Sequence, residues 1–299
     1  MALFPAPAGA QTAGPSDPVA WWLWPLTLFV ATMLLGMFAV VGGLGGGTIF
    51  VPLVSGFFPF HLDFVRAAGL LVALAGALAA GPELLRRNLA DLRLALPVAL
   101  VASASSIVGA RIGLALPTHV VQLALGVIVT AIMLVMVAAR RADFPRVPAA
   151  DALARALGIA GAYHEATIDR VVEWRVHRTW PALGLFVLIG LVAGMFGIGA
   201  GWANVPVLNL VMGAPLKIAA GTSVFLLSIT DTSAAWVYLH SGAVMPMIVV
   251  PSVVGMMIGS RLGVRLLAAA RPQTIRFVVV GVLLFAGVRA FLKGLGVWP

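Results

Sequence analysis

The stretch VVGGLGGGTIFVP, residues 40–52, follows a long apolar run and places five glycines among the six positions 42–47. Each glycine in a helix interior lowers helix stability by about 1 kcal/mol relative to Ala. The five glycines together therefore predict that a helix which begins in the preceding apolar run is broken here. A short apolar segment, residues 48–60, follows the break.

The same pattern occurs a second time in the chain. GLGGGTIFVP at residues 43–52 aligns with GIGAGWANVP at residues 197–206, and three Gly, one Val and one Pro match. Two further pairs keep the same order: AAG at 67–69 with AAG at 219–221, and GARIG at 109–113 with GSRLG at 259–263. Ordered matches of this kind indicate an internal duplication.

The composition excludes an ordinary soluble domain. Of the 299 residues, 62% are hydrophobic and 10% are charged, and the mean hydropathy is +1.08. A membrane-spanning helix needs about 20 apolar residues. Eight runs approach or reach that length, and they cover residues 21–41, 64–82, 94–113, 120–139, 181–196, 218–238, 244–263 and 275–292.

The predicted fold is therefore an all-α polytopic membrane protein. Two short segments, 48–60 and 202–212, follow the glycine clusters and read as half-spans that complete a broken crossing. We expect an extramembrane tail (1–20), a first membrane repeat (21–139), a cytoplasmic connecting segment (140–180) and a second membrane repeat (181–299).

The distribution of basic residues favours inverted repeats. If the short segments complete a crossing, the 19 Lys and Arg residues divide 15 to 4 between the two sides of the membrane, against 12 to 7 for parallel repeats. The positive-inside rule favours the first division and makes the basic side cytoplasmic. Both termini are then periplasmic. The net charge of +9 is explained by these loops, and no nucleic-acid partner is expected.

The glycine clusters are the candidate binding site. Irregular backbone at membrane depth is tolerated where it lines a cavity or is buried in protein, and matching breaks in two repeats indicate a transport site. The helix that restarts after each break offers free N–H groups to an anion. Close helix packing through small residues is the alternative. The candidate anion-binding residues are Gly45, Gly46, Gly47, Thr48, Gly199, Gly201, Asn204, Thr222, Ser223 and Thr230.

Polar residues make the second repeat chemically richer than the first. Asn204 stands where the first repeat has Phe50, and both ligand contact and a helix-cap role fit it. Asp231 is the acidic residue inside a predicted span, which makes it the proton-coupling candidate. A structural partnership of Asp231 with a neighbouring helix is the alternative. At 100° per residue, Thr222, Ser223 and Thr230 share one helix face.

Basic residues near span ends are weaker candidates. Arg111 and Arg261 occupy matching positions in the two repeats and could draw anions into a vestibule. Snorkelling to the membrane interface is the alternative interpretation for both. No catalytic constellation, metal-ligand pattern or cofactor motif is present in the sequence, so neither an enzyme nor a metal or cofactor site is expected.

The duplicated GLGGGTIFVPL and GIGAGWANVPVLNLVMGAP, followed by AAGTS and GSRLG, resemble the TauE/SafE family of sulfite and organosulfonate exporters over about residues 26–292. The resemblance implies a permease in the bacterial inner membrane that transports small sulfur-containing anions. We therefore expect export of sulfite or an organosulfonate. The alternatives are proton-coupled anion uptake through Asp231, and a membrane enzyme or assembly subunit. A homodimer is left open.

Overall fold

The computed structural model describes residues 22–43, 45–57, 60–117, 120–121, 123–124, 127, 144–145, 147–165, 169–269, 277, 281, 284, 288 and 292. Within these residues the protein is almost entirely helical. Two of the predicted spans, 120–139 and 275–292, lie mostly outside the described residues. The other six predicted spans are confirmed as long apolar helices.

Six helices are long and apolar enough to cross a membrane within the described part of the chain. Each of them lies over one of the six predicted runs, with ends that differ by a few residues. They are α1 (Leu23–Gly42), α3 (Leu62–Arg86), α4 (Leu92–Ala115), α7 (Thr179–Phe196), α9 (Leu216–His240) and α10 (Pro246–Ala269).

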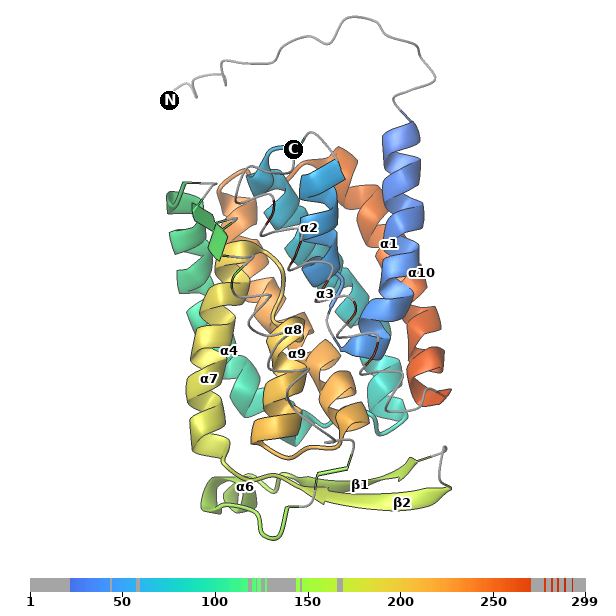
Figure 1. Ribbon diagram of the computed structural model, residues 1–299, viewed down its shortest axis with the longest axis vertical. Coiled ribbons are helices and arrows are strands. Elements are labelled where there is room, and N and C mark those ends of the chain that lie inside the picture. The colour runs from blue at the N-terminus through green and yellow to red at the C-terminus, as the bar shows by residue number, and fades with distance from the viewer. Residues whose placement is uncertain are drawn as a thin grey trace, which may run out of the picture.

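Short helices follow both glycine clusters, as the sequence predicts. Helix α2 (Gly47–Phe57) follows the first cluster. Helix α8 (Gly201–Pro206) follows the second and continues as the π-helical turn η1 (Val207–Val211). Neither is long enough to cross a bilayer alone, since 20 residues are needed for about 30 Å. The chain therefore breaks and restarts inside the helical bundle at both places (Figure 1).

The two halves of the chain exchange their helices in the bundle. Helix α1 of the first half packs along α10 of the second half. Helix α4 of the first half packs along α7 of the second half. Helices α3 and α9 pack against each other between these two pairs (Figure 1). In the same view, α1 runs from the end that carries the N-terminus toward the hairpin, whereas α7 leaves the hairpin and runs the opposite way.

The connecting segment forms a small unit at one end of the bundle. It consists of α6 (Ala152–Ala156) and an antiparallel hairpin of β1 (Ala160–Glu165) and β2 (Arg170–Arg175). Asp151 ties this unit to the membrane helices: its carboxylate accepts hydrogen bonds from the N–H of Ala154 at 2.8 Å and from the N–H of Thr179 at 2.7 Å. Burial acts to raise the pKa of Asp151, but these hydrogen bonds outweigh it and hold the pKa below 3.8.

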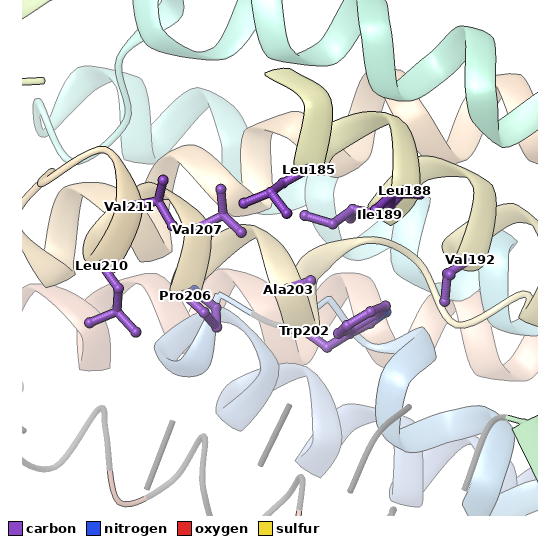
Figure 2. A pocket seen from close by; sticks show the side chains of 10 residues that line it. All are labelled: Leu185, Leu188, Ile189, Val192, Trp202, Ala203, Pro206, Val207, Leu210 and Val211. Atoms are coloured by element: carbon purple, nitrogen blue, oxygen red, sulfur yellow. The ribbon is translucent and has the colours of Figure 1, made fainter. Parts of the chain in front are cut away.

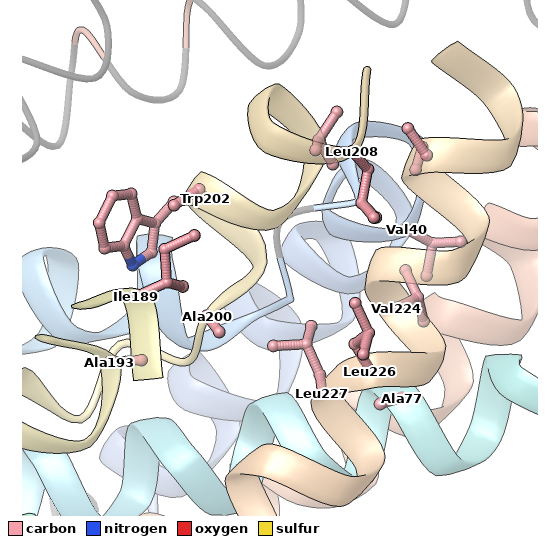
Figure 3. Packing of buried hydrophobic residues seen from close by; sticks show 14 of the residues in the cluster. Val40, Ala77, Ile189, Ala193, Ala200, Trp202, Leu208, Val224, Leu226 and Leu227 are labelled. Carbon is pink, nitrogen blue, oxygen red and sulfur yellow. The ribbon is translucent and has the colours of Figure 1, made fainter. Parts of the chain in front are cut away.

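Small and branched side chains fill the centre of the bundle. Figure 3 shows Val224, Leu226 and Leu227 of α9 beside Ala77 of α3, with Ala200 of the second glycine cluster facing them. All five side chains are almost fully buried. Because lipid tails are as apolar as these side chains, their burial stabilises the fold mainly through close packing. At the α1–α10 contact a Cβ on Gly36 would lie 2.8 Å from the Met256 carbonyl oxygen, so only glycine fits.

Candidate functional site

Each glycine cluster forms a turn with two residues in the left-handed region. Gly43 (φ 63°) and Gly45 (φ 67°) shape the first turn, and Gly197 (φ 67°) and Gly199 (φ 70°) shape the second. Gly43 and Gly197 also end α1 and α7 as their C-caps. Non-glycine residues are disfavoured in this conformation, so the alternating glycines of both motifs are required by the backbone itself.

The two turns lie against each other. The hydroxyl of Thr48, in the first turn of α2, donates to the Ile198 carbonyl oxygen of the second turn at 3.1 Å. A Cβ on Gly47 would lie 2.7 Å from the Gly69 carbonyl oxygen and 2.9 Å from the Ile198 carbonyl oxygen. The start of α2, with the positive end of its helix dipole, therefore lies against the second turn inside the bundle.

The predicted hydroxyl residues of α9 are divided among different contacts. Ser223 donates to the Gly43 carbonyl oxygen at 2.5 Å and so reaches the first turn. Thr222 accepts from the N–H of Asp91 at 3.1 Å, at the start of α4. Thr230 donates to the Leu226 carbonyl oxygen of its own helix at 3.1 Å. Of the three, Ser223 is the residue whose hydroxyl bonds to a glycine turn.

Asn204 is buried without hydrogen-bond partners. It lies in α8, it is 1% exposed, and neither Oδ1 nor Nδ2 has a partner among the described residues. A helix-cap role, the alternative considered from the sequence, does not apply, because no side chain caps α8. A buried amide without partners destabilises a fold by about 1–3 kcal/mol. Such a group is typical of a site whose ligand is the missing partner.

Asp231 faces the second glycine turn. Its Oδ2 lies 3.0 Å from the position that a Cβ on Gly199 would take. The side chain is 2% exposed, and Oδ2 has no hydrogen-bond partner among the described residues. Oδ1 lies 3.5 Å from the hydroxyl of Thr230. The structural alternative, a partnership with a neighbouring helix, finds no such partner in the described part of the chain.

Arg66 is a buried charged residue that the sequence interpretation counted only for topology. It is 2% exposed in α3 and forms an ion pair with Asp63. Its guanidinium donates to the carbonyl oxygens of Gly113 at 3.0 Å and Met195 at 3.2 Å. Tyr238 adds a hydrogen bond to the Gly194 carbonyl oxygen at 3.0 Å. Gly194 and Met195 lie at the end of α7, immediately before the second turn, and Gly113 lies at the end of α4, so the Arg66 cation sits at two helix C-termini.

An apolar hollow of about 370 Å³ lies beside the second turn, between α7 and the α8–η1 segment. Figure 2 shows its lining, in which the Trp202 indole lies next to the leucine, isoleucine and valine side chains of α7. None of its ten lining residues is charged or carries a hydroxyl. An oxyanion would lose its hydration there without gaining hydrogen bonds, so this hollow does not suit an anion.

The two predicted vestibule arginines lie away from the turns. Arg111 and Arg261 are both exposed. Arg261 lines a separate cavity of about 360 Å³ at the ends of α3 and α10. Neither arginine has a hydrogen bond to a residue of the glycine clusters in the described part of the chain.

A buried ion pair joins the hairpin to α9. Lys217 Nζ donates to Glu165 Oε1 at 2.7 Å, and the two side chains are 2% and 0% exposed. Tyr163 donates to Glu165 Oε2 at 3.3 Å. Burial, together with the charge of Glu165, raises the pKa of Tyr163 above its ordinary value of 10.0. Neither Lys217 nor Glu165 was singled out as a partner from the sequence, because they are 52 residues apart.

Among the residues that the structure describes, no group of three or more His, Asp or Glu side chains converges to hold a metal ion. The chain has no cysteine.

Comparison with known proteins gives the family of this chain. The family model described as sulfite exporter TauE/SafE matches residues 28–290. The chain belongs to the TauE/SafE family. A curated relative, the probable membrane transporter protein YunE of Bacillus subtilis (strain 168), is 26% identical over 113 residues.

The match to this relative is partial. It covers 38% of this chain and 41% of the relative, so less than half of either protein is aligned. No solved structure matches the chain. Family membership and the six apolar helices together support a multi-pass membrane protein of a transporter family.

Proposed function

We propose that this transporter exports a small sulfur-containing oxyanion, such as sulfite or an organosulfonate, across the bacterial inner membrane. Membership of the sulfite exporter TauE/SafE family supports the substrate class. The observation that carries the proposal is the contact between the two glycine turns, in which Thr48 at the start of α2 donates to Ile198 of the second turn. The helices that restart after the two turns offer N–H donors and positive dipole ends to an anion.

The proposed binding residues lie at the two turns. Backbone N–H groups that follow Gly47 and Gly201 contact the anion, and the amide of Asn204 supplies a side-chain donor that has no partner among the described residues. Ser223 holds the first turn in place through Gly43. Thr222 bonds to the start of α4 and Thr230 to its own helix, so neither hydroxyl is assigned to the anion.

In the proposed transport movement, the two repeats of the chain move relative to each other. We take the two repeats to be inverted in the membrane, with the hairpin on the cytoplasmic side and both termini periplasmic. The opposite directions of α1 and α7 and the exchanged pairing of α1 with α10 and α4 with α7 support this topology. One half then rocks against the other around the turns. With a negative interior, each anionic charge gains about 2.3 kcal/mol per 100 mV on leaving the cell, so export needs no coupling ion.

A direct test is flux in proteoliposomes that contain the purified protein. Sulfite, sulfate, thiosulfate and sulfoacetate are each loaded inside, and efflux is measured with and without a membrane potential. We expect efflux of at least one sulfur oxyanion that accelerates when the starting compartment is made negative. Absence of flux for every anion, from protein that is monodisperse and oriented in the vesicles, would refute the proposal.

Proton-coupled uptake is the second candidate, and Asp231 is the observation that favours it. Its Oδ2 lies against the second turn without a hydrogen-bond partner or an ion pair among the described residues. A carboxyl in such a place is a candidate proton carrier. Uptake that is driven by an inward pH gradient and becomes independent of that gradient in Asp231→Asn would select this candidate. Gradient-independent flux in the unmodified protein would exclude it.

A further inference from the structure

An arginine-lined cavity at the end of the bundle is separate from the glycine turns. Its volume is about 360 Å³, and it lies between the last turns of α3 and the second half of α10. Its lining combines four arginines, one glutamate and three apolar residues: Arg86, Arg87, Arg261, Arg265, Glu83, Leu78, Ala79 and Pro82. Helices α3 and α10 pack against each other and end at the side of the bundle that carries the hairpin (Figure 1).

The cavity carries an excess of positive charge. Glu83 is used within the protein, because its carboxylate accepts a hydrogen bond from Arg87 Nε at 2.6 Å. Arg86, Arg261 and Arg265 have neither an ion pair nor a hydrogen bond to any residue that the structure describes. Three guanidinium groups without partners in the described part of the chain therefore line one cavity. Guanidinium groups bind phosphate oxygens with paired hydrogen bonds.

The other wall of the cavity is apolar and faces outward. Leu78 is 57% exposed, and it lies eight residues before Arg86, which places it about 12 Å closer to the middle of the bundle. An occupant of this cavity thus meets both guanidinium groups and the exposed apolar side chain of Leu78. This combination fits an amphiphile rather than a free anion.

The cluster of four arginines is not repeated in the other half of the internal duplication. In the alignment of the repeats, Arg261 corresponds to Arg111, which is also exposed. Counting from the matched AAG and GARIG motifs, the counterparts of Arg86, Arg87 and Arg265 are Tyr238, Leu239 and Ala115. Only one of the four arginines therefore has a basic counterpart at the opposite end of the bundle. The cluster is specific to the hairpin side.

We propose that this cavity binds the phosphodiester headgroup of an anionic phospholipid, with an acyl chain lying along Leu78. Basic pockets between membrane helices on the cytoplasmic side are suited to such headgroups. Each arginine near a membrane surface strengthens the attraction to anionic lipid by about fivefold. The proposal concerns lipid binding at α3 and α10 and does not depend on which anion is transported.

The test uses the full-length protein in a neutral detergent, with lipid binding followed by native mass spectrometry. Phosphatidylglycerol is titrated against phosphatidylcholine, and glycerol phosphate is added in a separate arm as the soluble form of the same headgroup. We expect phosphatidylglycerol to bind, phosphatidylcholine to bind much more weakly, and glycerol phosphate not to compete at equal concentration. Arg261→Gln should weaken phosphatidylglycerol binding about fivefold, and adding Arg265→Gln should weaken it further.

Arg111→Gln is the matched control, because it removes an exposed arginine from the corresponding position of the other repeat. It should bind phosphatidylglycerol as the unmodified protein does. Equal loss of binding in Arg111→Gln and Arg261→Gln would show that lipid responds to overall charge, and would overturn the proposal. Full competition by glycerol phosphate would also overturn it, since the cavity would then bind a soluble phosphate. All three variants change exposed side chains, and a thermal unfolding curve confirms that each is folded.

Discussion

The contact between the two glycine turns makes a quantitative prediction for Gly47→Ala. A Cβ at this position would lie 2.7 Å from the Gly69 carbonyl oxygen and 2.9 Å from the Ile198 carbonyl oxygen, whereas ordinary contacts begin at 3.4 Å. The differences, 3.4 − 2.7 and 3.4 − 2.9, require the two carbonyls to retreat by 0.7 and 0.5 Å. Both oxygens belong to backbone, so no side-chain rotation can relieve the overlap.

The magnitude follows from two opposing effects. Alanine stabilises a helix by about 1 kcal/mol relative to glycine, and overpacking of a tight contact destabilises by about 1–3 kcal/mol. We therefore expect Gly47→Ala to leave stability unchanged or to reduce it by up to about 2 kcal/mol. Gly184→Ala in α7 is the matched control, because no atom lies within 4 Å of its Cβ position. It should gain up to about 1 kcal/mol.

Thermal unfolding in detergent, followed by tryptophan fluorescence, compares the two variants. A difference of about 1–3 kcal/mol corresponds to a difference in Tm of several degrees, at about 2–4 °C per kcal/mol for a chain of this size class. Anion efflux from proteoliposomes should fall in Gly47→Ala and remain unchanged in Gly184→Ala. If both variants shift Tm by the same amount and in the same direction, the close approach of the turns is not present in the protein.

Three further predictions follow from named contacts. Gly199→Ala and Gly242→Ala place alanine at φ 70° and 73°, so both proteins should lose about 1–2 kcal/mol of folding stability. Only Gly199→Ala, whose Cβ meets Asp231, should also reduce anion flux. Equal flux in the two variants would contradict the proposed site. Glu165→Gln breaks the buried ion pair with Lys217 and should destabilise the protein by about 3–5 kcal/mol. Glu83→Gln breaks an exposed pair with Arg87 and should change stability by at most about 1 kcal/mol. Similar unfolding temperatures for the two variants would be inconsistent with a buried pair. The pKa of Asp151 lies below its ordinary value of 3.8 in the folded protein, so its contribution to stability is present above pH 3.8 and is lost as the pH falls through the folded pKa. Acid unfolding curves should therefore show a smaller loss of stability in Asp151→Asn than in the unmodified protein. Identical curves for the two proteins would refute this.

Much of the architecture could be predicted because it depends on local sequence. Six long apolar runs gave six helices, since a run of that length can satisfy its backbone in a membrane only as a helix. The breaks at residues 42–47 and 197–201 were predictable because glycine alone adopts positive φ readily. The short helices after both breaks followed from the same reasoning.

Features that depend on side-chain partners could not be predicted in the same way. Thr222, Ser223 and Thr230 share a helix face, yet their hydroxyls go to three different elements, because the neighbouring helices and not the helix period decide the partner. Arg66 entered only the count of basic residues on each side of the membrane, yet it is buried and its guanidinium bonds to the Met195 carbonyl oxygen at the end of α7. The Glu165–Lys217 pair joins a hairpin to a membrane helix, and no local pattern shows such a contact.

The amide of Asn204 tests the central proposal most directly. Because neither of its polar atoms has a partner among the described residues, Asn204→Leu replaces it with an apolar side chain of similar size and should keep or raise the Tm. Efflux of sulfite from proteoliposomes should nevertheless fall at least about tenfold, the equivalent of about 1.4 kcal/mol. Unchanged sulfite efflux in a stable Asn204→Leu protein would show that the anion does not pass the glycine turns.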